Sequence, residues 1–189
     1  VGPGYGLEVG LRADQIALFL AAYVLGGALA QIPVGWLADK FDRRAVLIWV
    51  SVAAIAACGA TIGLSGTGTV GVFTAATMFG FVTLPVYSVS TAHAHDFAES
   101  HERVELSAAL MFLYAVGAIA SPLLASMVIA AYGPSAMFIM IGAAHVVLIV
   151  FGVARMRARA APDTRTAYTY EPRTSFLIGR LLRRGRDRD

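Results

Sequence analysis

Charged residues are scarce in this chain and are missing altogether from three long stretches. Only 14% of the 189 residues are Asp, Glu, Lys or Arg, whereas a soluble domain usually carries about 25%. Residues 15–38, 45–92 and 106–154 contain none of these four residue types. Each stretch is longer than the roughly 20 apolar residues that a helix needs to cross a bilayer. The pattern excludes an ordinary soluble domain and predicts a membrane protein.

Cysteine is almost absent as well, because Cys58 is the only one. No disulfide can form within the chain, so cysteine usage says nothing about the redox compartment, and Cys58 is expected to be a small packing residue. A secretory signal is excluded, since Glu8, Arg12 and Asp14 precede an apolar run that is too long for one. Residues 1–13 are rich in Gly and cannot form a span, so we expect them to be the remnant of an earlier helix.

Turn-forming residues divide the apolar stretches into five expected helices. Backbone polar groups in hydrocarbon must be satisfied within their own segment, so helices are the only sensible assignment for these runs. The predicted fold class is all-α, a polytopic transmembrane helix bundle. The expected division is an extracytoplasmic stub at 1–13, a five-helix domain at 14–154 with spans at about 15–38, 45–64, 70–92, 106–131 and 135–154, and a basic tail at 155–189.

Basic residues gather on one side of the predicted membrane. Arg12 is alone on the other side, while every other Lys and Arg lies in the loops 39–44 and 93–105 or in the tail. Because short cytoplasmic loops carry an excess of Lys and Arg, we expect these loops and the C-terminus to be cytoplasmic. The Ala- and Arg-rich composition suggests a bacterium, hence an integral protein of the bacterial plasma (inner) membrane.

Small residues and prolines inside the spans predict how the helices pack. Small residues recur four positions apart at Gly59 and Gly63 and again at Gly117, Ser121 and Ala125, a spacing that lets backbones approach closely in lipid. Prolines inside the first, third and fourth spans each remove a backbone donor and favour a kink. The second and fifth spans have no internal proline and few polar groups, so we expect them to be peripheral and lipid-facing. The three kink prolines are Pro33, Pro85 and Pro122.

The loop after the first span carries a recognisable pattern, Gly35-Trp36-Leu37-Ala38-Asp39-Lys40-Phe41-Asp42-Arg43-Arg44. It resembles the signature of the major facilitator superfamily: Gly, three residues, Asp, a basic residue, any residue, Gly and two basic residues. In that family the signature lies in the cytoplasmic loop between helices 2 and 3, and a weaker copy lies between helices 8 and 9. Asp42 stands where the signature has its second Gly, which fits the looser copy.

The resemblance gives the loop residues roles. Gly35 would let a neighbouring helix approach, and Asp39 would face the positive N-terminus of another helix. Lys40, Arg43 and Arg44 would hold the loop on the cytoplasmic side, and the five together would form a conformational latch. The alternative is a generic charged loop that topology alone places there.

A second resemblance lies in the fourth span, Gly117-Ala118-Ile119-Ala120-Ser121-Pro122. It is similar to a Gly-x-x-x-Gly-Pro element of helix 5 and its symmetry mate, helix 11. The third span lacks an Arg that the first half of the family usually has. The resemblance therefore implies the C-terminal half, helices 8–12, with helix 7 mostly missing and the N-terminal six-helix half as a partner.

In this family, helices 7, 8, 10 and 11 face the central pathway, which nominates polar groups on the first, third and fourth spans. No carboxylate lies mid-span, so for proton-coupled transport the coupling acid would have to lie in the missing half or in helix 7. The alternatives are a uniporter or coupling through another group. Helix–helix hydrogen bonding or an interfacial aromatic belt is the alternative role for each nominated residue. They are Tyr23, Gln31, Thr74, Thr77, Tyr87, Ser88 and Tyr114.

Two polar segments invite other interpretations. His93, His95 and His101 beside several acids could hold a metal, but Asp96 and Glu99 have the spacing of a capping box for the fourth span, and we expect neither metal nor cofactor. Residues 174–186 could form an interfacial helix on anionic lipid, or the tail could be disordered.

The predicted function is secondary transport of a small solute by alternating access, in the lipid bilayer, with no enzymatic activity and no nucleic-acid partner. One alternative is a membrane scaffold or degenerate fragment without transport. Another is a membrane enzyme with a His/Asp site at 93–105.

Overall fold

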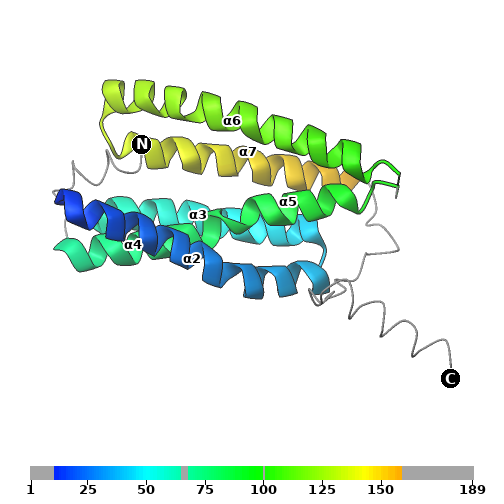
Figure 1. The fold of residues 1–189 in the computed structure, drawn as a ribbon, viewed down its shortest axis with the longest axis horizontal. Coiled ribbons are helices and arrows are strands. Elements are labelled where there is room, and N and C mark those ends of the chain that lie inside the picture. Colours follow the sequence, from blue (N-terminus) through cyan, green and yellow to red (C-terminus); the bar gives the residue numbers. More distant parts are fainter. Residues whose placement is uncertain (1–10, 65–67, 100, 159–189) are drawn as a thin grey trace, which may run out of the picture.

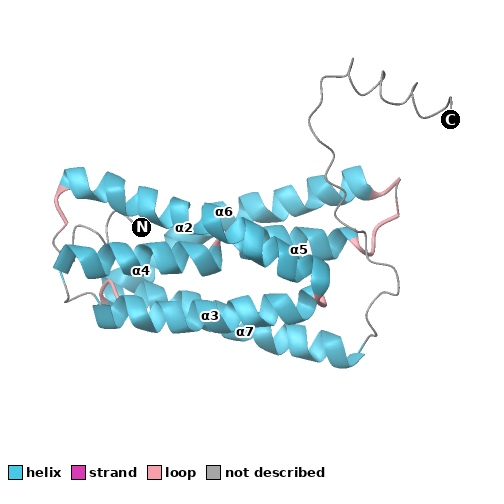
Figure 2. Ribbon diagram, turned by 90° about the horizontal axis from the view of Figure 1, so that it is seen from below, coloured by secondary structure: helices cyan, strands magenta, loops and turns pink. Residues whose placement is uncertain are grey.

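The computed structural model describes residues 11–64, 68–99 and 101–158, and over these ranges the chain is helical without any strand (Figures 1 and 2). Five stretches of the described part are long and apolar enough to cross a membrane. The predicted all-α polytopic bundle is confirmed. The helices are α2 (Ala13–Lys40), α3 (Arg43–Leu64), α4 (Gly68–Thr83), α5 (Pro85–His95), α6 (Arg103–Tyr132) and α7 (Ala136–Ala158).

Two predicted segments fall largely outside the described residues. They are the N-terminal stub, described only from Leu11 onward, and the tail, described only as far as Ala158 at the end of α7. The expected interfacial helix at 174–186 lies in the part that is not described.

The third span is a single apolar crossing that breaks in its middle. α4 ends at Thr83 and α5 begins at Pro85. Proline has no backbone N–H, and its ring clashes with the carbonyl four residues earlier, so the helix cannot continue undisturbed through this point. Pro33 and Pro122, by contrast, lie inside α2 and α6, which are assigned as helix on both sides of them.

The closest helix contact joins α2 to α4 at two glycines. A Cβ placed on Gly26 would overlap the backbone carbonyl of Thr77, and one placed on Gly80 would overlap the carbonyl of Tyr23. The two backbones therefore touch, which is how small residues stabilise helix pairs in lipid.

The small residues singled out from the sequence do not make this contact. A Cβ on Gly59, Gly63 or Gly117 would meet nothing within 4 Å among the described residues. At these glycines the four-residue spacing therefore pointed to open faces, whereas Ala125, the last member of the series in α6, is buried. For Gly117, Ser121 and Pro122, packing stays a prediction that needs a neighbour outside the described chain.

α3 lies in the middle of the bundle rather than at its periphery. It packs against α2, α4 and α5, and α7 packs against it as well. Its buried residues include Val46, Val50 and Ala54. The expectation of a peripheral helix is therefore wrong for α3 within the described bundle, because few polar groups make a helix suited to lipid and to a core alike.

α6 has the opposite character and forms one edge of the bundle (Figure 1). Ala125 is its only buried residue in the described structure. Large apolar side chains such as Phe112, Ile119 and Leu123 are exposed along it. An apolar surface of this length needs lipid or other helices to cover it.

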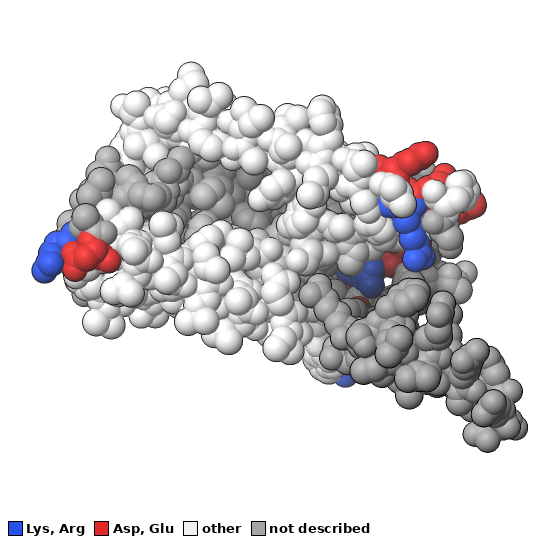
Figure 3. Space-filling model, in the orientation of Figure 1, with Lys and Arg blue, Asp and Glu red and all other residues white. Residues whose placement is uncertain are grey.

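Charge is confined to the two ends of the bundle. In Figure 3 the visible Lys, Arg, Asp and Glu atoms lie at the ends of the long axis, with an uncharged band between them. Arg12 and Asp14 form one exposed pair at the start of α2. The other end holds a larger set of charges, from which the candidate site is built.

Candidate functional site

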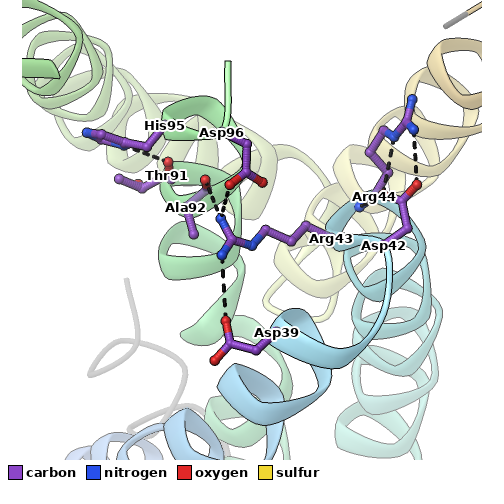
Figure 4. A network of polar contacts seen from close by, with 8 residues as sticks. All are labelled: Asp39, Asp42, Arg43, Arg44, Thr91, Ala92, His95 and Asp96. Atoms are coloured by element: carbon purple, nitrogen blue, oxygen red, sulfur yellow. Dashed lines mark hydrogen bonds and ion pairs between the residues drawn. The ribbon is translucent and has the colours of Figure 1, made fainter. Parts of the chain in front are cut away.

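Arg43, the first residue of α3, joins three helices at the end of the bundle where the signature loop lies (Figure 4). Its Nη1 donates to the backbone carbonyl of Ala92 at 2.6 Å and to Oδ1 of Asp96 at 2.7 Å. Its Nη2 lies 3.6 Å from Oδ1 of Asp39, which makes an ion pair. The α2–α3 loop is thereby attached to the end of α5.

This arrangement is buried on the α5 side and open on the α2 side. The side chains of Arg43 and Asp96 are 10% and 4% exposed, whereas that of Asp39 is 40% exposed. A short charge-assisted bond inside protein is much stronger than one in water. The Arg43–Asp96 pair is therefore the firm part of the junction, and Asp39 is its solvent-facing partner.

Asp42, the residue that departs from the family signature, caps α3. It directly precedes the helix, and its Oδ1 accepts the backbone N–H of Arg44 at 2.9 Å. Aspartate is among the preferred residues for this position. The same carboxylate holds the Arg44 guanidinium at 3.2 Å and 3.0 Å. A glycine at this position would provide neither contact.

Arg44 also reaches the last helix. Its Nη1 donates to the backbone carbonyl of Arg155 in α7 at 3.5 Å. The adjacent arginines thus point in two directions, since Arg43 turns towards α5 while Arg44 turns towards α7 (Figure 4).

The other signature residues have simpler surroundings. Lys40 lies 4.8 Å from the centre of the Trp36 ring, a cation–π contact. A Cβ on Gly35 would meet nothing within 4 Å among the described residues, so the expected close helix approach is not seen there. Asp39 pairs with the side chain of the first residue of α3, which puts its carboxylate near the start of that helix.

The expected capping box of the fourth span is wrong. α6 begins at Arg103, and its N-cap Glu102 has no side-chain capping bond. Asp96 instead ends α5, and its carboxylate is taken by Arg43. The sequence could not indicate this, because the stronger attraction of a buried arginine from another helix is a tertiary contact.

The histidines of the same stretch turn to different partners. The His95 ring bonds Thr91 at 2.8 Å and Ser107 at 3.0 Å, which links α5 to α6. The His93 ring lies 5.1 Å from the Phe97 ring. Among the described residues, no group of three His, Cys, Asp or Glu side chains is placed to hold a metal ion.

Three of the nominated pathway residues belong to two pairs near the break between α4 and α5. The Tyr23 hydroxyl lies 3.4 Å from Oγ1 of Thr83, a residue that sequence reasoning missed. The rings of Tyr87 and Tyr114 are 5.0 Å apart, and both side chains are exposed. Thr83 could have been nominated from the sequence, because it lies two residues before Pro85, where a kink was expected.

The remaining nominees are not brought together. The hydroxyls of Thr74 and Thr77 donate to the carbonyls of Val70 and Phe73 in their own helix, at 2.9 Å each. Such bonds satisfy the hydroxyl locally and can bend a helix. Gln31 and Ser88 are exposed.

Comparison with known proteins gives one family. A family model described as Major Facilitator Superfamily matches residues 1–186. The uncharacterized MFS-type transporter YcaD of Salmonella newport (strain SL254) is 30% identical over 155 residues, which cover 78% of this chain and 37% of that protein. The protein of the same name from Salmonella heidelberg (strain SL476) has the same identity and coverage. The chain thus spans 37% of the length of these relatives. No solved structure matches it.

Proposed function

Since this chain belongs to the Major Facilitator Superfamily, we propose that it is part of a secondary transporter that moves a small solute by alternating access. In this proposal its five spans are helices 8–12 of the C-terminal half, in a bacterial inner membrane with a cytoplasmic C-terminus. Its partners are the lipid bilayer, the N-terminal six-helix half and the solute. The exposed apolar surface of α6 supports a partner in the membrane, because such a surface must be covered by lipid or by other helices.

The observation that carries the proposal is the junction at Arg43. One buried side chain ties the loop between α2 and α3 to the end of α5. Helices fixed to one another in this way would move as one body when one half rocks against the other. In this proposal Asp39, at the exposed side of the junction, would exchange Arg43 for a partner in the other half and so act as a latch.

The break between α4 and α5 supports a pathway at mid-span. Interrupted helices in membranes are tolerated where they line a cavity or meet other protein. The pairs Tyr23–Thr83 and Tyr87–Tyr114 provide hydroxyls and ring faces close to this break. Their chemistry suits a small solute with hydrogen-bonding groups in a largely apolar cavity. In the described spans Asp and Glu lie only near the ends, so a proton-coupling acid would belong to another part of the transporter.

Side-dependent labelling tests the proposal without knowledge of the solute. In the intact protein, with Cys58→Ser and any other cysteine replaced, Tyr87→Cys should react with a membrane-impermeant maleimide in right-side-out and in inside-out vesicles. Val147→Cys is the control, because Val147 is 68% exposed on α7, the span that the sequence predicts to be peripheral and lipid-facing, where the reagent should be excluded.

The outcomes separate the candidate functions. Labelling of Tyr87→Cys from both sides supports alternating access, since a static barrier would leave it reachable from one side at most. Labelling from one side only contradicts alternating access. A scaffold without a pathway predicts no labelling from either side.

A further inference from the structure

A cavity lies at the same end of the bundle as the signature loop, and none of the paired tyrosines lines it. It has a volume of about 470 Å³, is open on one side and is lined by residues of α3, α5 and α7 and by Phe97. No Cα of α5 lies within 8 Å of a Cα of α7, while α3 packs against both. The cavity is therefore the space that opens where α5 and α7 diverge over α3.

The polar lining of this cavity consists of two arginines, a histidine and Ser90. Arg44 from α3 and Arg155 from α7 reach it, together with His93 from α5. Asp42 holds the Arg44 guanidinium in position, and Arg44 in turn reaches the Arg155 carbonyl. The Arg155 side chain is exposed and makes no ion pair with the described residues. Arg155 thus adds a positive charge beside the Arg44–Asp42 ion pair, and among the described residues no Asp or Glu lines the cavity.

The rest of the lining is mostly apolar. Leu47 and Ile48 from α3, Phe151 from α7 and Phe97 after α5 form most of the wall. Gly152 lets α7 approach α3 closely at this point, because a Cβ there would lie 3.2 Å from Cγ1 of Ile48. A free inorganic anion would use the arginines but leave this apolar wall without a partner.

We propose that this cavity binds an anionic phospholipid. The phosphate of the headgroup would sit between Arg44 and Arg155, and the start of an acyl chain would lie against Ile48 and Phe151. Basic pockets between membrane helices on the cytoplasmic side are suited to anionic headgroups, and the volume is within the usual range for a small-molecule site. Bound there, the lipid would bridge α3 and α7 beside the Arg43 junction and stabilise that end of the half.

Native mass spectrometry of the intact protein in mild detergent tests this, with phosphatidylglycerol and phosphatidylcholine as probes. The wild type should retain phosphatidylglycerol in preference to phosphatidylcholine. Arg155→Gln should weaken phosphatidylglycerol binding about fivefold, since one basic residue near an anionic surface contributes about that much. Arg157→Gln is the matched control, because Arg157 is exposed on the same helix and does not line the cavity.

A second variant separates a lipid from a free phosphate. Ala94 lines the cavity, and Ala94→Leu adds apolar volume without changing charge, so it should reduce phosphatidylglycerol binding while Arg155 remains. Unchanged lipid binding in Ala94→Leu together with displacement by millimolar inorganic phosphate would show a soluble-anion site and overturn the proposal. Equal losses for Arg155→Gln and Arg157→Gln, or equal retention of the two lipids, would also overturn it. The labelling of Tyr87→Cys is independent of these measurements, so this inference and the transport proposal can fail separately.

Discussion

The buried pairing of Arg43 with Asp96 predicts an unusually large effect from a single substitution. Their side chains are 10% and 4% exposed, with Nη1 and Oδ1 2.7 Å apart. Asp96→Ala would leave the guanidinium buried beside a carbonyl and the more distant Asp39. Removing one partner of a buried pair costs about 3–5 kcal/mol. Asp39 is 40% exposed and 3.6 Å from Arg43, and pairs of that kind contribute only about 0–1 kcal/mol.

The apparent midpoint of thermal unfolding of the intact protein in detergent measures this difference. Asp96→Ala should lower the midpoint several times more than Asp39→Ala. Asp14→Ala is the control, because Asp14 pairs with Arg12 at the exposed opposite end of α2 and its loss should change little.

The double variant Arg43→Met with Asp96→Ala sharpens the test. Replacing both members of a buried pair by apolar residues is often close to neutral, so the double variant should be more stable than Asp96→Ala alone. The reasoning is refuted if Asp96→Ala lowers the midpoint no more than Asp14→Ala does, or if the double variant loses as much as the two single variants added together.

Two further predictions concern helix contact and the latch. Gly26→Ala should sharply reduce the yield of monodisperse protein in size-exclusion chromatography, because its Cβ would overlap the Thr77 carbonyl, whereas Gly59→Ala has open space and should not; equal yields would contradict the α2–α4 contact. Asp39→Asn in the intact transporter should change the transport rate more than the apparent substrate affinity, and kinetics equal to those of the wild type would argue against a latch.

The helices were predictable because crossing a bilayer imposes a local requirement on the chain. A run of uncharged residues long enough to span hydrocarbon can be recognised without knowledge of its neighbours. The turn at 132–135 follows in the same way from backbone chemistry. Proline alone did not locate the interruption, because Pro33 and Pro122 lie inside continuous helices and only Pro85 begins a new one. Each span and turn depends on one run of consecutive residues, and the structure has helices where these runs predict them.

The faces of those helices were not predictable. Lipid is as apolar as leucine, so a face that meets lipid and a face that meets another helix have the same composition. The spacing of small residues therefore drew attention to Gly59 and Gly117, where an added Cβ would meet nothing within 4 Å among the described residues. It passed over Gly26 and Gly80, where an added Cβ would overlap the facing helix. The position of α3 at the centre was missed for the same reason.

The charged site was likewise predictable only in part. Its loop was visible from Gly35 to Arg44, because a signature is a matter of order and spacing along one segment. The partners of its arginines were not predictable, because they are distant in the sequence. Asp96 lies 53 positions from Arg43, and Arg155 lies 111 positions from Arg44. Opposite charges at one end of a bundle can pair in many ways until the helices are placed. The sequence thus specified which residues are charged and where the chain crosses the membrane. The packing of α2, α3, α5 and α7 selected the ion pairs, because it decides which charged side chains are buried next to one another.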